Sequence, residues 1–308
     1  MFDRLARRLA RHGSRILGPI ECLVTARKTL SGAPIFITGP ARSGTTLVYQ
    51  TLVYELNGGS VREIVARFPY SPVLVSALVN PLFRSADSKP NFESEYGRGA
   101  GLSGIVQGHE IWSRWFPWDA REGALSVKQQ YSLRDTIAGL EHATGTPLIL
   151  KWPGFACYLD DLCKTFPKAF FIFVDRETEA LIRSIGNGRI RLQGSMEKPI
   201  SRSPGGGHLN GSDRGFEGII NYVSTVRKRI SSFMQEIHEE QYVIVRYDEF
   251  CIDPRCFVAG IADKYENWSG RSLKQHGVIP RHFEISKGSA LPKEYEEAIR
   301  GLRLSQLQ

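Results

Sequence analysis

The sequence predicts an α/β fold, a P-loop-type three-layer sandwich in which helices cover both faces of a central, mostly parallel sheet. Short apolar runs rich in β-forming residues alternate with longer segments of helical periodicity, as is typical of parallel sheets. Residues 170–174, Phe-Phe-Ile-Phe-Val, are apolar on both faces, as expected of a strand covered on both sides. A glycine-containing loop, residues 39–44, lies between the first predicted strand and a helical pattern. These three observations together favour a doubly covered sheet.

The predicted elements follow one another as strand and helix units. We expect strands at residues 33–38, 147–151, 169–174 and 242–247, and helices from Thr45 onward, over 156–166 and over roughly 216–238. Residues 193–218 are rich in Gly, Ser and Pro, which is typical of a lid, a binding loop or disorder. No composition shift divides residues 31–308, so they are predicted to form a single domain.

The first thirty residues differ from the rest of the chain in their excess of positive charge. They carry seven basic and two acidic side chains, a net charge of +5, whereas the whole chain carries +8. Apolar residues recur there at helical spacing: Phe2, Leu5, Leu9, Ile16, Leu17 and Ile20. Residues 1–30 are therefore interpreted as a basic amphipathic segment. It either contacts an anionic membrane surface through residues 1–20 or packs on its own domain as an ordinary helix or frayed end.

Composition excludes several protein classes. With 42% hydrophobic and 23% charged residues the chain is typical of globular proteins, and no apolar run reaches the roughly 18 residues of a membrane-spanning helix. The arginines near the N-terminus do not fit a secretory signal. Five cysteines without metal-ligand spacing indicate reduced thiols, hence a cytoplasmic location with peripheral membrane attachment as an alternative. Nothing in the sequence predicts the oligomeric state.

Residues 39–46, Gly-Pro-Ala-Arg-Ser-Gly-Thr-Thr, have the glycine spacing of a P-loop and its strand-to-helix context. Backbone N–H groups and a helix N-terminus at such a loop bind phosphate. The lysine that triphosphatases require after the second glycine is replaced by Thr45, and the basic residue is Arg42, inside the loop. The loop is therefore predicted to hold a phosphate without a γ-phosphoryl group, and no metal is expected.

A second phosphate site is predicted from Arg176 and Ser184. Arg176 follows the strand at 169–174, where ligands of open α/β sheets bind, and Ser184 follows two helical turns later. Two phosphate sites, without the lysine that binds a nucleoside triphosphate, suggest a nucleotide that is phosphorylated at two places.

These motifs resemble those of the sulfotransferases that use 3′-phosphoadenosine 5′-phosphosulfate (PAPS). Residues 38–46 resemble their 5′-phosphosulfate loop, and Arg176 with Ser184 resembles their 3′-phosphate motif. Leu150-Lys-Trp-Pro153, Phe166-Pro-Lys-Ala169 and Tyr247-Asp-Glu-Phe250 are similar to segments of the tyrosylprotein and bacterial members. The resemblance spans residues 34–254.

The resemblance implies roles for individual residues. Arg42 would neutralise the leaving 5′-phosphate, and Lys151 would approach the sulfuryl group. The implied donor-binding residues are Arg42, Ser43, Gly44, Thr45, Thr46, Arg176, Ser184 and, against the adenine, Tyr247. The implied reaction is in-line transfer of a sulfuryl group from PAPS to an acceptor hydroxyl of a small molecule, glycan, lipid or tyrosine, with neither metal nor nucleic acid involved.

The two branches of the family differ in the catalytic base, and this chain lacks the base of the small-molecule branch. The small-molecule branch has a histidine two residues after the lysine, and this chain has Pro153 there. The tyrosylprotein-like branch has a glutamate 21 residues after the loop arginine, which corresponds to Glu63. Glu63 is the first candidate for a carboxylate base, although it could instead be a surface charge paired with a neighbouring arginine. His109 and Glu110 are the second candidates.

Aromatic residues between 112 and 118 are interpreted either as an acceptor wall or as a corner of the core. Acceptor pockets are expected from residues 69–118 and 193–218. Two other functions remain alternatives: a P-loop kinase or NTPase that takes its lysine from elsewhere, and a non-catalytic, membrane-associated nucleotide-binding protein.

Overall fold

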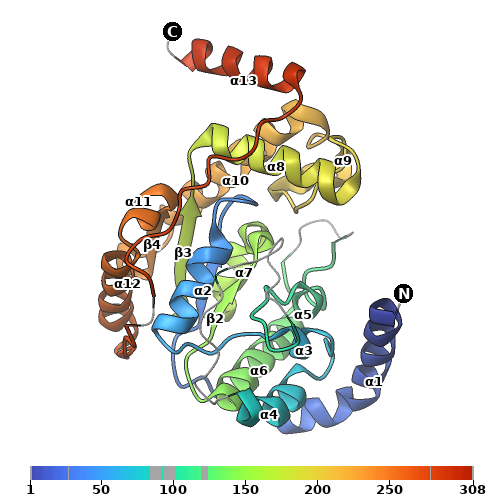
Figure 1. Ribbon diagram of the computed structural model, residues 1–308. Helices are drawn as coiled ribbons and strands as arrows, with labels where there is room; N and C mark the ends of the chain where they lie inside the picture. Colours follow the sequence, from blue (N-terminus) through green and yellow to red (C-terminus); the bar gives the residue numbers. More distant parts are fainter. Residues whose placement is uncertain are drawn as a thin grey trace.

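The computed structural model describes residues 2–26, 28–83, 92, 101–118, 124–277 and 279–306. Its centre is a sheet of four parallel strands, β1 (Ile35–Thr38), β2 (Ile149–Lys151), β3 (Phe170–Asp175) and β4 (Tyr242–Arg246), in the order β2-β1-β3-β4. Figure 1 shows helices on both sides of this sheet. The predicted α/β class and parallel sheet are confirmed, and every predicted strand is present within a few residues.

Alternation along the strands divides the core into two layers. Ile35 and Ile37 face one layer, where α2 (Thr45–Glu55) and α12 (Pro254–Ser269) pack on the sheet. Phe36 faces the other, which is built from α6 (Val127–Thr144), α7 (Leu159–Thr165), α8 (Thr178–Gln193) and α10 (Gly215–Met234). Because successive side chains of a strand point to opposite faces, one apolar run supplies both layers. This is the three-layer sandwich that the sequence predicts.

The other elements connect or extend these layers. They are α1 (Phe2–Thr25), α3 (Glu63–Ala66), α4 (Pro72–Phe83), α5 (His109–Trp112), α9 (Gly207–Asn210), α11 (Tyr247–Ile252), α13 (Lys293–Gln306) and the 3₁₀ turns η1 (Pro153–Cys157), η2 (Pro204–Gly206) and η3 (Glu239–Gln241). The helix predicted over 156–166 is shorter than expected. Proline and glycine open a 3₁₀ turn, η1, and α7 begins only at Leu159. Residues 193–218 contain η2 and α9, so this segment has structure of its own.

Helix α1 packs against α4 and α6, and it runs without a break through Gly13 and Ser14. Its protein-facing side is polar. Ser14 accepts a hydrogen bond from the backbone N–H of Tyr70 (2.7 Å), and the carboxylate of Glu21 accepts from the N–H of Val73 (2.7 Å) at the start of α4. A carboxylate there satisfies otherwise unpaired donors of the first helical turn. Among the described residues, no helix is long and apolar enough to cross a membrane.

Candidate functional site

The carboxyl ends of β1, β2 and β3 meet at one edge of the sheet and open into a cavity of about 570 Å³. Parallel strands bring the residues that follow them to the same edge, which is where open α/β sheets bind ligands. The lining residues that the sequence singles out are Arg42, Gly44, Thr45, Thr46, His109, Phe116, Trp118, Lys151, Arg176, Ser184 and Tyr247. The structure thus brings the two predicted phosphate motifs and the predicted lysine into one cavity.

The loop at residues 39–44 makes a tight turn that requires glycine at both of its ends. A Cβ atom on Gly39 would overlap the carbonyl oxygen of Val174, and one on Gly44 would overlap the ring of Tyr247. Arg42 has a φ of 70°, a left-handed conformation that is uncommon for residues other than glycine and is found at functional sites. The turn leads directly into the N-terminus of α2 at Thr45. The loop is therefore shaped as the phosphate-binding motif predicts.

Two contacts from outside the motif fix this loop in place. The backbone N–H of Ala41 donates to the hydroxyl of Tyr222 on α10 (2.9 Å). The hydroxyl of Thr38 donates to the carbonyl of Pro153 (3.1 Å), which ties the end of β1 to the segment after β2. The role of Tyr222 was not predicted, because it lies about 180 residues from the loop and belongs to no motif.

Arg176 is a buried cationic side chain that lines the cavity, with 7% of its surface exposed. Its Nη1 donates to the carbonyl of Arg42 (3.2 Å), and its guanidinium carbon lies 4.6 Å from the ring centre of Tyr247. Within the described chain, its Nε and Nη2 atoms and the Oγ atom of Ser43 have no hydrogen-bond partner although they are buried. Buried donors without partners are costly. An anion with several oxygen atoms would satisfy them, so these residues fit a phosphate group.

Arg227 of α10 positions the segment that carries Arg176. Its guanidinium donates to the Oδ1 of Asp175 (2.9 Å), to the carbonyl of Arg176 (2.7 Å) and to the hydroxyl of Thr178 (2.9 Å). These bonds hold the junction between β3 and α8. Arg227 was missed by sequence reasoning, since nothing in the helical pattern of α10 distinguishes it from a surface charge.

Arg42 and Ser184 lie in direct contact. The Nε of Arg42 donates to the Oγ of Ser184 (3.2 Å), so the loop after β1 and the second turn of α8 meet at the cavity. The sequence assigned these side chains to two separate phosphates. Their contact shows that the two predicted phosphate sites are neighbours.

Lys151 ends β2 and points its ammonium group into the cavity region. The residue is 4% exposed, and its Nζ lies 3.5 Å from the Oε1 of Gln107. Burial, with a smaller contribution from the nearby charge of Arg42, lowers the pKa of Lys151 to about 7. An anion in the cavity would stabilise the charged form of this lysine. The site therefore gains positive charge when an anion binds.

Glu63, the first candidate for the base, is not among the residues that line the cavity. It is buried, and its Oε1 accepts hydrogen bonds from Arg7 of α1 (2.5 Å) and from Arg67 (3.2 Å). Arg7 also lies 3.8 Å from Glu110. His109 does line the cavity, and its Nδ1 lies 3.2 Å from the carboxylate of Glu110. His109 of the second candidate pair thus lines the cavity. Glu63 does not, and Arg7 lies between its carboxylate and that of Glu110.

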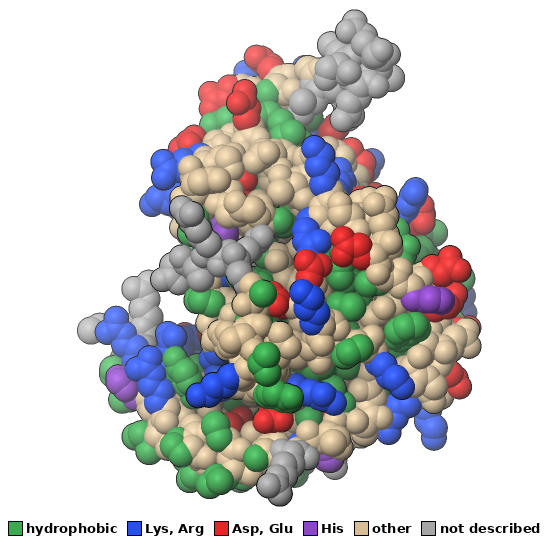
Figure 2. All heavy atoms as spheres, turned by 180° about the vertical axis from the view of Figure 1, so that it is seen from behind, with side chains coloured by type: hydrophobic (Ala, Val, Ile, Leu, Met, Phe, Trp, Pro, Cys, Tyr) green, Lys and Arg blue, Asp and Glu red, His purple; other side chains and the backbone are tan. Residues whose placement is uncertain are grey.

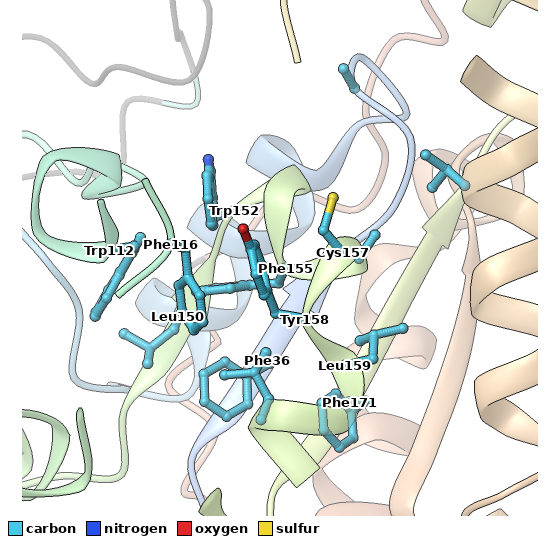
Figure 3. Packing of buried hydrophobic residues seen from close by; sticks show 14 of the residues in the cluster. Phe36, Trp112, Phe116, Leu150, Trp152, Phe155, Cys157, Tyr158, Leu159 and Phe171 are labelled. Carbon is cyan, nitrogen blue, oxygen red and sulfur yellow. The ribbon is translucent and has the colours of Figure 1, made fainter. Parts of the chain in front are cut away.

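The aromatic residues from 112 to 118 divide between the core and the wall of the cavity. Trp112, Trp115 and Phe116 are buried in the core, and Phe116 and Trp118 line the cavity. Figure 3 shows Phe116 near Trp152, with ring centres 6.3 Å apart, and Trp152 lines the cavity as well. Ile200 and Ser201 of the 193–218 segment also line the cavity. Among the residues that the structure describes, no group of three or more His, Cys, Asp or Glu side chains could hold a metal ion.

Comparison with known proteins agrees with this geometry. Residues 34–266 match the model of a family described as "Sulfotransferase family". The sulfotransferase STF9 from Mycobacterium avium superposes with a TM-score of 0.56 at 15% identity, over 99% of this chain and 74% of that one. The sulfotransferase STF1 from Mycobacterium tuberculosis H37Rv gives a TM-score of 0.51 at 16% identity, over 97% and 80%. A comparison with curated proteins found no match.

Proposed function

Because the chain belongs to the sulfotransferase family, we propose that it transfers a sulfuryl group from PAPS to an acceptor hydroxyl. The observation that carries this proposal is the set of buried donors of Arg176 and Ser43 that lack partners in the described chain and lie at the phosphate-binding loop. When bound, PAPS supplies the activated sulfuryl group and leaves as the bisphosphate nucleotide. The residues of the cavity would bind this anionic donor and orient it.

On the donor side, we assign the 5′-phosphate to the loop and the 3′-phosphate to the end of β3. Ser43, Gly44, Thr45 and Thr46 would bind through backbone N–H groups and hydroxyls at the start of α2. Arg176 and Ser184 would bind the second phosphate, and Tyr247 would lie against the base. Arg42 lies between the two groups, since it contacts Ser184 and belongs to the loop.

Transfer requires that negative charge be neutralised on the departing phosphate. Arg42 and Lys151 are cations that line the cavity, close enough for the charge of Arg42 to lower the pKa of Lys151. Burial holds Lys151 ready to take up a proton, because its pKa of about 7 rises when an anion approaches. These two side chains would therefore act together on the leaving group, with Lys151 as its proton donor.

For the base, we propose His109. Its ring lines the cavity, and Glu110 lies at its Nδ1, an arrangement in which a carboxylate orients an imidazole so that Nε2 accepts a proton. Glu63 stays a prediction from the family resemblance, and it could act only after Arg7 and Arg67 release its carboxylate. Phe116, Trp118 and Trp152 would form the acceptor wall.

The test of the function is incubation with sulfur-labelled PAPS and a cell extract, followed by identification of the labelled product by mass spectrometry. We expect label in an acceptor with wild-type protein, and labelling slowed by about 10²–10³-fold with Arg42→Ala. Hydrolysis of ATP with magnesium, without transfer of label, would instead assign the chain to the kinase or NTPase class.

The test of the base compares two variants on the labelled acceptor. His109→Asn should lower kcat by about 10²-fold or more, as for other general bases. Glu63→Gln should lower it by less than about tenfold, since this carboxylate does not reach the cavity wall. Both variants should bind 3′-phosphoadenosine 5′-phosphate like the wild type. The reverse order of effects would return the role to Glu63.

A further inference from the structure

Helix α1 is oriented with its apolar side toward solvent. Leu5, Leu9, Ile16, Ile20 and Leu23 have exposed fractions from 50% for Ile20 to 79% for Leu23. The protein-facing side carries polar residues that are 4% exposed or less: Ser14, Glu21 and Thr25. An amphipathic helix that packs on its own domain normally buries its apolar side. This arrangement therefore leaves an apolar face without a partner in the described chain.

The polar contacts of α1 hold it in this orientation. Glu21 accepts hydrogen bonds from the N–H groups of Val73 and Leu74, and Ser14 accepts one from the N–H of Tyr70. Rotating the helix to bury its apolar side would leave these buried groups without partners, which is costly. The outward direction of the apolar residues is thus fixed by hydrogen bonds to α4 and the segment before it.

Positive charge accompanies the apolar face. Arg8, Arg11 and Arg15 of α1 are exposed, and they alternate along the helix with the exposed apolar residues. The neighbouring α4 exposes Leu78 (74%) and Leu82 (73%). Figure 2 shows hydrophobic and basic side chains gathered at its lower left, over α1 and α4. We call this basic and apolar surface of α1 and α4 the α1–α4 face.

We propose that the α1–α4 face docks on an anionic membrane surface. Aliphatic side chains would enter the headgroup boundary, and the arginines would reach the lipid phosphates, as in helices that lie in a membrane interface. A second copy of the chain is a poorer occupant, because a symmetric contact would bring the arginines of both copies together. Charge complementarity therefore favours lipid over self-association.

The protein-facing side of α1, opposite the exposed α1–α4 face, reaches the residues next to the cavity. Arg7 of α1 lies 3.8 Å from Glu110, the neighbour of His109, and His109 lines the cavity. Docking does not require the proposed reaction, so it can be measured without donor or acceptor.

The test is co-sedimentation of the full chain with phosphatidylcholine vesicles, with and without phosphatidylglycerol. We expect binding to the anionic vesicles alone, and weaker binding as salt is added. Replacing Leu9, Ile16 and Leu23 together by serine should lower vesicle affinity by at least about tenfold. Arg8→Gln and Arg11→Gln should each lower it by about fivefold. All these side chains are exposed, so thermal unfolding should stay as in the wild type.

Two exposed residues elsewhere serve as matched controls. Ile252→Ser on α11 removes a side chain that is 65% exposed, and Arg281→Gln removes an exposed positive charge. Neither change should affect vesicle binding. The proposal is overturned if the wild type does not bind anionic vesicles, if it binds neutral vesicles equally well, or if the serine variant still binds. It is also overturned if sedimentation velocity without lipid reveals a dimer that the serine variant loses.

Discussion

The two sides of the cavity differ in how they are built. On the donor side, Lys151 is the last residue of β2, Arg176 directly follows β3, and Arg42 lies in the loop after β1. On the acceptor side, His109 and Trp118 lie on or after the four-residue helix α5, and Ile200 lies between helices. The register of the sheet fixes the positions of the donor-side residues. The positions of the acceptor-side residues depend instead on side-chain contacts between surface segments. Substitutions on the donor side should therefore affect binding and catalysis together, and those on the acceptor side should affect acceptors selectively.

The largest effect is expected for Arg42→Ala. Removing the loop cation should lower kcat by about 10²–10³-fold, because charge on the departing phosphate is left without its nearest partner. Ser113→Ala, on the acceptor side of the same cavity, should stay within about tenfold of the wild type. Steady-state kinetics with PAPS and the labelled acceptor measures both. Equal losses in the two variants would contradict the difference between the two sides.

The next effect concerns the turn itself. A methyl group on Gly44 would overlap the Tyr247 ring at a backbone φ of 97°, so Gly44→Ala should destabilise the fold by about 1–3 kcal/mol. It should also weaken binding of the bisphosphate nucleotide. Gly260→Ala on α12 is the control, because its methyl group meets no atom, and it should stabilise by about 0.5–1 kcal/mol. Chemical denaturation and calorimetry give both values. A Gly44→Ala variant as stable as the wild type would show that the loop adapts.

Lys151 should make donor binding depend on pH. Its pKa is about 7 in the folded protein without donor, and anion binding favours the charged form, so nucleotide affinity should fall as pH rises above 7. The lysine of the unfolded chain keeps its proton to higher pH. The cost of burying it is therefore full below pH 7 and disappears as pH rises toward the unfolded value.

Lys151→Met separates these effects. Without donor, the variant should unfold at a higher temperature than the wild type at pH 6, and this difference should shrink at alkaline pH. Its nucleotide affinity should be lower and should lose the pH dependence above 7. A wild-type affinity that does not change between neutral and alkaline pH would show that Lys151 is already charged before the donor binds.

The smallest effect is expected on the acceptor wall. Trp118 is 46% exposed and packs against His208, with ring centres 5.0 Å apart. Trp118→Ala should raise KM for the acceptor by about fivefold, which corresponds to the loss of one aromatic contact. Affinity for 3′-phosphoadenosine 5′-phosphate should not change. A loss of nucleotide affinity would mean that Trp118 belongs to the donor side.

Most of the donor side could be predicted from the sequence, because its residues lie at the ends of apolar runs with the pattern of strands in a parallel sheet. Gly39, Gly44 and Arg176 follow from strand position and glycine spacing alone. Tyr222 and Arg227, which hold the loop and the end of β3, could not be predicted, since they come from α10 and make contacts across more than fifty residues. The resemblance supplied Glu63, but the contact of Glu63 with Arg7 depends on how α1 packs. The helix itself was predicted, and the outward direction of its apolar side was not.

The central claim is that the end of β3 binds a 3′-phosphate and the loop a 5′-phosphate. Calorimetric titration of 3′-phosphoadenosine 5′-phosphate and of adenosine 5′-phosphate, into wild type and Arg176→Gln, tests it most directly. The bisphosphate should bind the wild type at least about tenfold more tightly than the monophosphate, and this preference should disappear in the variant. Equal affinities in the wild type, or a preference that Arg176→Gln retains, would contradict the assignment.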